Sequence, residues 1–540
     1  MNFATTHANP NFPNNPGYNL YKGARYVPKF SDQPGSVWTN TIKYEPLTIV
    51  LWEGNSYTSK TFVPVGVDIS NEVYWAQTGN YNAQVEQYRK EVEEVKKEID
   101  NLTLTNWVNP IYFGAVGDGV TDDGDAIVEA SKHGSLLGDN EHIFYIGHTI
   151  SLTDVNMKNM KIKYGNNLQM QFSANYFTID NCYFEMPLSE TQKPAIDRGD
   201  PFLRMSGCNY GEITNCHFHR GLWLGSINGC HNIKFYGNTF DNVYQTHQQG
   251  NGYGFLVNYG STNISFINNN FFNIMRHAVY LTNDGAELNN HIIISNNTFD
   301  NSGTPEIPNT FNQYPYMIAN RATSDVLISN NLFNEVWGAV VLTNFAHQTD
   351  NEMYDINIVD NIIRGNMPDN NQPMISFATT TKMPKNVNII GNIIENCFYG
   401  IDTCDLCLIA NNNITSTKAA FHFKGIDNTR ICNIISNAVF GSDYAITASS
   451  TENTFGTLVF KDNYFKTINQ SLDLDGVTLT NLIVQNNFFD ISYAIYNAAE
   501  SITNGFFSGN YSTLSTINGL LFHIANLKKS FEETFTFGES

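Results

Sequence analysis

Ile233-Lys-Phe-Tyr-Gly-Asn238-Thr-Phe240 is one copy of a short phrase that recurs along this chain. The phrase reads apolar–x–apolar–x–x–Asn–x–apolar, and it occurs thirteen times, with gaps of 20 to 34 residues between copies. Its sixth position is occupied in turn by Cys182, Cys216, Asn238, Asn269, Asn297, Asn331, Asn361, Asn392, Asn412, Asn437, Asn463, Asn487 and Asn510. A fixed unit separated by segments of variable length indicates a solenoid.

The phrase itself predicts the kind of solenoid. Its period-two alternation indicates a strand with one buried face, and stacked copies of such a strand form a parallel sheet. The recurring Asn tolerates left-handed backbone angles at the bend, and its amide can bond the next Asn along the stack. A ladder of this kind is typical of a right-handed parallel β-helix. The regular apolar positions argue against the alternative, an Asn-rich low-complexity tract.

Two further regularities complete the expected coil. Aromatic residues two positions after the ladder residue predict an internal stack, formed by Phe240, Phe271, Phe299, Phe333, Phe465 and Phe489. A second apolar run leads the Asn-bearing strand, as in His277-Ala-Val-Tyr-Leu281 and Gly338-Ala-Val-Val-Leu342. With a third strand after the Asn turn, the prediction is an all-β fold with three strands per coil.

Composition narrows the classes of partner. The formal net charge of −21 argues against nucleic acid or an anionic membrane as the main partner, whereas 13% aromatic residues suit sugar chains. The N-terminus, Met1-Asn-Phe-Ala-Thr-Thr-His7, has neither a basic stretch nor an apolar segment of signal-peptide length. No apolar run approaches the roughly 18 residues of a membrane span. We therefore expect synthesis in a cytoplasm without a signal peptide, and no membrane insertion.

The cysteines indicate structure rather than chemistry. Cys182 and Cys216 fall on the ladder position, so we expect small buried residues and no disulfide. Cys404-Asp-Leu-Cys407 has the spacing of a zinc or redox motif, but it has no second pair and Cys407 falls inside a repeat strand. The sequence predicts no metal cluster and no cofactor.

Two segments precede the solenoid. Residues 1–80 hold short aromatic runs such as Leu47-Thr-Ile-Val-Leu-Trp52 between Gly and Pro residues, which predicts a compact β-rich module. In residues 81–105, apolar residues recur at spacings of three and four: Val85, Tyr88, Val92, Val95, Ile99 and Leu102. This narrow seam favours a coiled coil over a lone amphipathic helix, without distinguishing a trimer from a dimer. The β-helix is expected over residues 106–510 and a small cap over 511–540.

Phe113-Gly-Ala-Val-Gly-Asp-Gly-Val-Thr-Asp-Asp123 stands where the solenoid begins. This stretch resembles the opening motif of the pectate-lyase-like β-helix superfamily, in which it starts a helix that caps the solenoid. Asp122 and Asp123 are interpreted as turn and helix-cap residues that satisfy free amides, rather than as a catalytic pair.

The N-terminal module carries a narrower resemblance. Gly23-Ala-Arg-Tyr-Val-Pro28, Gly54-Asn-Ser-Tyr57, Val63-Pro-Val-Gly66 and Tyr74-Trp75 resemble the virion-attachment region of bacteriophage tailspikes and pre-neck appendages, especially those of small short-tailed phages of Gram-positive hosts. This resemblance implies a homotrimer in the virion, with residues 1–80 docked on tail or connector proteins. It also implies a β-helix that binds or cuts a host-surface polysaccharide or teichoic acid.

The superfamily resemblance places substrate along the first strand of each coil and the segments before it. In this chain the densest polar group of that region surrounds coils four to six. Its members include Asp241, His247, Arg276, His277, Asp284, Glu287, Glu306, Arg321 and Glu335.

Three chemistries remain open at these positions. Glycoside hydrolysis needs two carboxyls about 5–9.5 Å apart, for which Asp284 and Glu306 are the first choice and Glu287 and Glu335 the substitutes. A lyase needs a base beside a cation, which His277 with Arg276 or Arg321 would provide. The same His and Arg could hold the phosphate of a teichoic acid and assist its cleavage.

Substrate binding is expected from the aromatic and polar residues nearby. Trp223 and Tyr280 are predicted to be exposed platforms on which sugars stack, with Arg276, Arg321, His247 and Asp241 around them. The alternatives are a receptor-binding fibre without catalysis and a secreted polysaccharide lyase. The missing signal peptide, the docking-like module and the expected coiled coil argue against the latter.

Overall fold

The computed structural model describes residues 37–537 except residues 54, 80–106, 153–154, 166–167, 187–199, 245–251, 283–286, 302–315, 322, 343–352, 367–371, 378–383, 404–406, 424–430, 449–452, 475–476, 492–495, 498–500 and 514–534. The chain divides into two compact units, with the boundary between Asn106 and Trp107. The coiled coil predicted over residues 81–105 lies outside the described residues. Within the described part of the chain, no helix has the length and apolar character needed to cross a membrane.

The first unit contains a small antiparallel sheet in the order β1 (Ile49–Trp52), β2 (Asn55–Ser59), β3 (Trp75–Gly79). Its core is separate from that of the solenoid and is built largely from aromatic rings, with Trp38 against Trp52 at 4.7 Å and Tyr44 against Trp75 at 5.2 Å. The aromatic runs of this region therefore form a β-rich module, as the sequence predicts.

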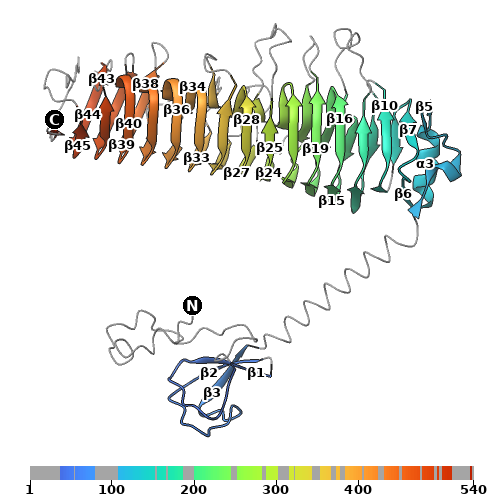
Figure 1. Cartoon of the computed structure of the whole chain (residues 1–540), viewed down its shortest axis with the longest axis horizontal. Coiled ribbons are helices and arrows are strands. Elements are labelled where there is room, and N and C mark those ends of the chain that lie inside the picture. Colours follow the sequence, from blue (N-terminus) through green and yellow to red (C-terminus); the bar gives the residue numbers. More distant parts are fainter. Residues whose placement is uncertain are drawn as a thin grey trace. The chain divides into compact units, whose positions relative to one another are not determined.

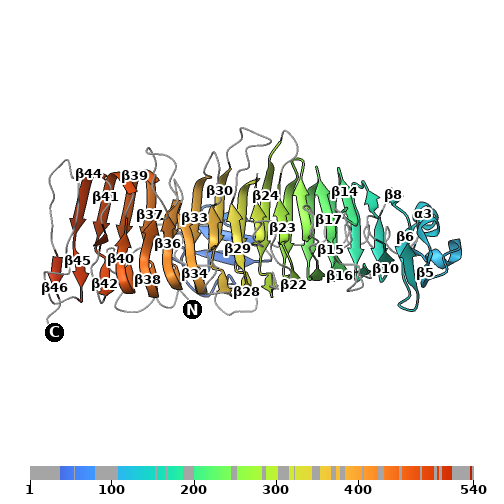
Figure 2. The ribbon, with the colours of Figure 1, turned by 90° about the horizontal axis from the view of Figure 1, so that it is seen from above.

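The second unit is a right-handed parallel β-helix with three strands per coil, which confirms the fold predicted from the repeat. Figure 1 shows its strands lying side by side in order along one axis, from β5 beside α3 to β45, and Figure 2 shows the same order from above. The strands fall into three columns, each hydrogen-bonded in register from coil to coil.

The first column, the Asn-strand sheet, ends just before each ladder residue. It comprises β4 (Trp107–Val108), β6 (Ser135–Leu137), β9 (Asn156–Lys158), β12 (Phe177–Asp180), β15 (Asn209–Thr214), β18 (His231–Tyr236), β21 (Thr262–Ile267), β24 (Asn289–Ser295), β27 (Thr323–Ser329), β30 (Tyr354–Val359), β33 (Lys385–Ile390), β35 (Cys407–Ala410), β37 (Ile431–Ile435), β39 (Asn453–Lys461), β41 (Val477–Gln485) and β44 (Ser501–Ser508).

The second column, the post-Asn strands, follows the ladder residue. It comprises β5 (Asp118–Asp122), β7 (Ile143–Ile146), β10 (Lys161–Tyr164), β13 (Tyr183–Glu185), β16 (His217–Gly221), β19 (Thr239–Val243), β22 (Asn270–Ile274), β25 (Thr298–Asp300), β28 (Leu332–Val336), β31 (Ile362–Gly365), β42 (Phe488–Ile491), β45 (Asn510–Ser512) and β46 (Phe535–Phe537).

The third strands complete each coil. They are β8 (Ile150–Leu152), β11 (Met170–Phe172), β14 (Leu203–Ser206), β17 (Trp223–Asn228), β20 (Tyr253–Asn258), β23 (His277–Leu281), β26 (Tyr316–Asn320), β29 (Gly338–Leu342), β32 (Pro373–Phe377) and β43 (Tyr496–Asn497). Four longer strands span the second and third columns: β34 (Ile393–Thr403), β36 (Asn413–Phe423), β38 (Ala438–Ala448) and β40 (Tyr464–Asp473).

The Asn ladder is present and buried. Asn238 shows the pattern: its amide nitrogen donates to Oδ1 of Asn269 (2.9 Å) and to the carbonyl oxygen of Ile213 (2.8 Å), and its backbone N–H also donates to Oδ1 of Asn269 (2.9 Å). The same bonds recur down to Asn487 and Asn510. Cys216 occupies the ladder position as a buried free thiol, and its N–H donates to Oδ1 of Asn238 (2.8 Å).

One detail of the bend differs from the expectation. The left-handed backbone falls on the residue before the ladder Asn, for example Asn268 (φ 57°) before Asn269 and Asn330 (φ 56°) before Asn331. The assignment of that conformation to the ladder Asn itself was wrong. The reason is that the ladder side chain must point into the stack, so its neighbour makes the turn; Asn and Gly tolerate this conformation best.

The predicted aromatic stack is confirmed. Phe240, Phe271, Phe299 and Phe333 follow one another on successive coils with ring centroids 4.6 to 4.9 Å apart. Phe465 and Phe489 continue the motif at 5.4 Å. These rings are buried, so the post-Asn strands contribute an apolar inner face along the core.

The entry of the β-helix carries α3 (Gly124–His133), as the opening motif predicts. Asp123 is its N-cap residue, but its buried carboxylate accepts from the amides of Val116 (2.6 Å) and Gly117 (3.2 Å) rather than from the helix. Asp122 accepts from the amides of Gly124 (3.0 Å) and Gly147 (2.8 Å). Both carboxylates satisfy free amides of the turn, in agreement with a structural role.

Candidate functional site

Five of the eleven predicted site residues come together on the third strands. Trp223 lies on β17, Arg276 directly before β23, His277 and Tyr280 on β23, and Arg321 directly after β26. Tyr253 on β20 and Tyr316 on β26 join them. We call these seven residues the outer cluster: Trp223, Tyr253, Arg276, His277, Tyr280, Tyr316 and Arg321.

Strand alternation explains why the outer cluster is separate from the main core. Val279 and Leu281 belong to the interior of the β-helix, so Tyr280 between them faces the other side of β23. On that side Tyr253 and Tyr280 belong to a second apolar cluster, against which Trp223 packs. The outer cluster therefore lies on the outside of the solenoid wall.

Rung-to-rung register brings the rings into contact. Trp223 pairs with Tyr253 across β17 and β20, and Tyr253 pairs with His277 across β20 and β23. The ring centroids of these pairs are 5.5 and 5.6 Å apart, and Tyr280 lies 5.1 Å from Tyr253 and 5.2 Å from His277. Four consecutive coils thus supply one continuous aromatic surface, because Tyr316 on β26 extends it.

Two guanidinium groups lie on these rings. The guanidinium carbons of Arg276 and Arg321 are each 4.9 Å from a ring centroid, over Tyr253 and Tyr280 respectively. Arg276 is only 3% exposed, and burial lowers its pKa from the ordinary value. Among the residues that the structure describes, no hydrogen-bond partner meets Nε or Nη1 of Arg276. Buried N–H groups of a cation are costly without an acceptor, so this position is suited to an anion.

His277 is held as a neutral imidazole. Its Nδ1 is 2.8 Å from the carbonyl oxygen of Tyr316, which requires the tautomer with the proton on Nδ1 and leaves Nε2 as the acceptor. Burial lowers the pKa of His277 well below 6.5, and the positive charge of Arg276 lowers it further. A neutral imidazole beside a guanidinium can accept a proton while the cation holds an anionic group.

The expected exposure of this region was wrong. Tyr280 was predicted to be an exposed sugar platform, but it is buried, and so are Arg276 and His277. They do face away from the main core, but they stack on one another across the coils, which removes them from solvent. Trp223 is half-buried, and its Nε1 donates to the carbonyl oxygen of Gly225 (3.0 Å).

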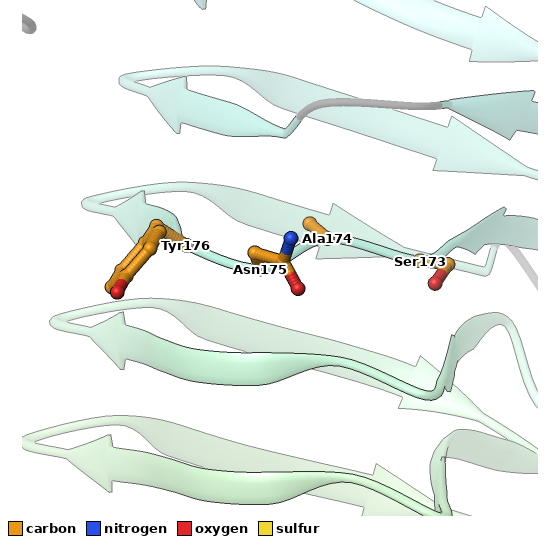
Figure 3. Close-up of a pocket in the computed structure, with 4 residues that line it drawn as sticks. All are labelled: Ser173, Ala174, Asn175 and Tyr176. Carbon is orange, nitrogen blue, oxygen red and sulfur yellow. The ribbon is translucent and has the colours of Figure 1, made fainter.

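Exposed aromatic rings occur elsewhere, at positions that were not predicted from the sequence. Tyr176, directly before β12, and Tyr210, near the start of β15, are 72% and 55% exposed and stack with ring centroids 5.3 Å apart. Beside them, residues 173–176 line a depression of about 310 Å³, and Figure 3 shows Ser173, Ala174, Asn175 and Tyr176 along this one turn. The sequence carries a signal for this stack. Tyr176 precedes Phe177, Tyr210 precedes Gly211, and Phe177 pairs in register with Gly211.

The predicted carboxyl groups are more scattered. Asp284, Glu306 and His247 lie outside the described residues, so the Asp284–Glu306 pair stays a prediction. Glu287 is exposed. Glu335 is also exposed and lies on β28, a post-Asn strand, so it belongs to a different column from the outer cluster.

Asp241 also lies among the post-Asn strands, on β19. Its contacts are with two histidines of β16: Nε2 of His217 is 3.1 Å from Oδ2 and Nδ1 of His219 is 2.6 Å from Oδ1. Burial opposes the charge of Asp241, but the bonds from both imidazoles keep its pKa below the ordinary value. The grouping was missed in sequence, although His219 and Asp241 each stand three positions after a ladder residue.

A buried polar group lies farther along the third-strand column. The carboxylate of Asp402 accepts from Oγ of Ser376, from the N–H of Phe377 and from Nδ1 of His422, each at 2.8 Å. Asp402 stands between the hydroxyl and the imidazole, so His422 is not placed to activate Ser376. The group acts as a hydrogen-bonded support within the wall.

The comparisons with known proteins show a likeness in fold only. No family model matches it, and no curated protein matches it. Three solved structures illustrate the likeness. A tailspike protein of Escherichia coli bacteriophage HK620, solved with a hexasaccharide, is 11% identical, with 82% of this chain and 79% of that chain covered and a TM-score of 0.47.

The surface adhesin PfbA of Streptococcus pneumoniae is 13% identical, with 67% and 93% covered and a TM-score of 0.39. An exopolygalacturonase of Thermotoga maritima is 11% identical, with 73% and 96% covered and a TM-score of 0.39. At these scores, the chemistry of this chain has to be argued from its own residues.

Proposed function

We propose that this chain is a bacteriophage tail appendage that attaches to the host surface by binding an anionic wall glycan, a teichoic acid or an acidic polysaccharide, at the outer cluster. One observation carries the proposal: Arg276 is buried over the ring of Tyr253 with Nε and Nη1 unpartnered among the described residues. A phosphate or carboxylate supplies the acceptor that these donors need.

The arrangement suits a charged sugar polymer in two ways. Guanidinium groups recognise phosphate and carboxylate through parallel hydrogen bonds, whereas aromatic rings offer apolar faces to sugar rings. The formal net charge of −21 repels polyanions in general. A local pair of guanidiniums, Arg276 and Arg321, would therefore concentrate binding at one place on the rod.

Depolymerisation of the bound glycan is the second part of the proposal. Neutral His277 directly follows Arg276, an arrangement that could serve a lyase or a phosphodiester cleavage. A hydrolase would instead use the Asp284–Glu306 pair. The alternative is a receptor-binding fibre that holds the glycan without cutting it.

Attachment to the virion would use residues 1–80, docked on phage tail or connector proteins. The separate aromatic core of β1–β3 supports an independently folded docking module. The coiled-coil pattern of residues 81–105 favours an oligomer, and the resemblance to phage appendages implies a homotrimer. Light scattering of the purified chain tests this part directly. A monomeric mass would overturn the trimeric appendage.

The binding test uses defined polymers. Purified poly(glycerol phosphate), poly(ribitol phosphate), polygalacturonate and neutral dextran are titrated into the protein and binding is followed by calorimetry. We expect binding of at least one anionic polymer, and a loss of about tenfold or more in affinity for Arg276→Met, because charge-assisted bonds contribute about 1.5–3 kcal/mol. Arg364→Met is the matched control, since Arg364 pairs with Glu395 on the exposed surface.

Equal binding to dextran, or wild-type affinity in Arg276→Met, would contradict the proposed site. Product analysis in the same mixtures distinguishes a depolymerase from a receptor-binding fibre. New phosphomonoesters, unsaturated ends or reducing ends indicate depolymerisation, and binding without any of them indicates a receptor-binding fibre.

A further inference from the structure

Two imidazoles and one carboxylate form a compact group on the post-Asn strands. His217 and His219 stand two residues apart on β16, so both side chains leave the same face of the strand. Asp241 on β19 pairs in register with His219. The ligand atoms of the three residues all lie within 4.8 Å of one another.

We propose that His217, His219 and Asp241 form a binding site for a divalent transition-metal ion, with Zn²⁺ as the preferred ion. Imidazole nitrogens with a carboxylate oxygen are a donor set suited to Zn²⁺ and related ions, whereas Mg²⁺ and Ca²⁺ prefer oxygen ligands throughout.

The distances are close to those that such an ion requires. With bonds of about 2.0–2.2 Å in tetrahedral geometry, ligand atoms are about 3.3–3.5 Å apart. The nitrogen–oxygen distances of 3.1 and 2.6 Å need to widen by less than about 1 Å. The ion would take the place of the protons that now bridge each imidazole to Asp241.

The scaffold holds the three side chains ready for an ion. β16 and β19 are hydrogen-bonded rungs of one rigid sheet, so little order is lost on binding. The side chain of Asp241 is 17% exposed and that of His217 is 40% exposed, so the group is open on one side. Three protein ligands leave a fourth position on that side for water or an anionic oxygen.

The surrounding charge also favours a cation. Glu185 on β13 pairs in register with His219 from the opposite side. Nη1 of Arg220 lies 3.9 Å from Oε1 of Glu185. These neighbours therefore include two carboxylates, those of Glu185 and Asp241, and one guanidinium. The other His–Asp contacts of the described chain bring a single imidazole to a carboxylate, whether exposed, as His291 with Asp325, or buried, as His422 with Asp402.

The test measures metal binding by the full-length chain. Protein stripped with a chelator is titrated with Zn²⁺ against a chromophoric competitor, and bound metal is counted by elemental analysis after desalting. We expect one equivalent of Zn²⁺ per chain, an increase of Tm with Zn²⁺, and a Co²⁺ derivative with the intense visible bands of a tetrahedral site. His217→Gln and Asp241→Asn should lose at least about 100-fold in affinity, because each removes a ligand of the ion. His291→Gln is the matched control and should bind as the wild type does.

His217 is the most exposed of the three ligands, so its replacement is the variant best tolerated by the fold, and circular dichroism confirms folding. Less than a tenth of an equivalent bound by the wild type would overturn the site. Wild-type affinity in both His217→Gln and Asp241→Asn would overturn it as well. The readout is independent of glycan binding at the outer cluster.

Discussion

Two sets of buried polar groups in this β-helix differ in whether their hydrogen bonds are satisfied. Along the Asn ladder, each buried amide donates to the next Asn and to a backbone carbonyl, and each side-chain oxygen accepts from the Asn of the preceding coil. In the outer cluster, Arg276 is equally buried but Nε and Nη1 have no partner among the described residues. A satisfied network stabilises the scaffold, whereas unsatisfied donors mark a place for a ligand.

This contrast has a physical origin. The ladder repeats one residue at one position, so donors and acceptors match from coil to coil without any outside group. The outer cluster combines different side chains, and the guanidiniums of Arg276 and Arg321 lie over the rings of Tyr253 and Tyr280. The comparison predicts that substitutions in the two regions will differ most in their effect on stability.

The largest effect is expected at the ladder. Asn331→Ala removes the acceptor of Asn297 and the donor to Ile294 and Asn361, and water cannot reach these buried groups. At about 1–3 kcal/mol for each unsatisfied group, we expect a loss of about 3–5 kcal/mol in the free energy of unfolding. Denaturant unfolding followed by circular dichroism measures it. The control is Asn388→Ala, whose amide bonds Asn357 on the partly exposed face and whose loss should cost less than about 1 kcal/mol. Equal losses at the two positions would remove the distinction between ladder and surface.

A pH-dependent effect is expected at His277. Its folded-state pKa is lowered, so below about pH 6.5 the unfolded chain binds a proton that the folded chain does not. Stability should therefore fall as the pH drops from 6.5 toward the folded pKa, with a contribution of up to about 1.4 kcal/mol per pH unit. His277→Gln should remove this contribution, as unfolding at pH 7.5 and 5.5 will show. A wild-type slope in His277→Gln would contradict a buried neutral imidazole.

A smaller change in stability is expected for Arg276→Met. The removed guanidinium has unsatisfied donors, and a flexible apolar chain of similar length keeps the packing on Tyr253. Replacing a buried charge in this way is often neutral or stabilising, so the free energy of unfolding should change by less than about 1 kcal/mol. A loss as large as that of Asn331→Ala would show that Arg276 belongs to the scaffold rather than to a binding site.

The smallest effect is expected on the exposed surface. Arg364→Ala breaks a solvated pair with Glu395 at 3.3 Å and should cost less than about 0.5 kcal/mol. Unfolding at low and high salt should differ little between this variant and the wild type. A loss above about 1 kcal/mol would mean that surface charges, too, contribute to the scaffold.

Most of the fold could be predicted from the sequence, because the same phrase recurs thirteen times. Period-two alternation, the ladder residue and the Phe two positions later each correspond to a structural feature. The left-handed turn was assigned one residue too late, because propensity alone does not tell whether the Asn side chain bonds its own turn or its neighbour in the stack. Only the coil register settles that.

The grouping of these candidate residues was predictable from the sequence, but their burial was not. Trp223, Arg276, His277, Tyr280 and Arg321 were selected as polar and aromatic residues around coils four to six, and the structure brings these five together. Their burial could not be read from alternation, because it arises from contacts between residues 23 to 41 positions apart on neighbouring coils, such as Arg276 with Tyr253 and Tyr280 with Arg321. The His217–His219–Asp241 group also depends on contacts between neighbouring coils, which become visible in the sequence only when successive copies of the phrase are aligned.

The unequal spacing of the ladder residues has a consequence for evolution. Successive ladder residues are 20 to 34 positions apart, yet the bonds between them keep nearly the same lengths. Insertions and deletions between phrases therefore leave the scaffold unchanged, and a segment can be exchanged between related genes without refitting the core. If the proposed attachment role holds, a lineage carrying this rod could alter the surfaces it recognises by recombination alone, at a rate set by gene exchange rather than by stepwise mutation of the core.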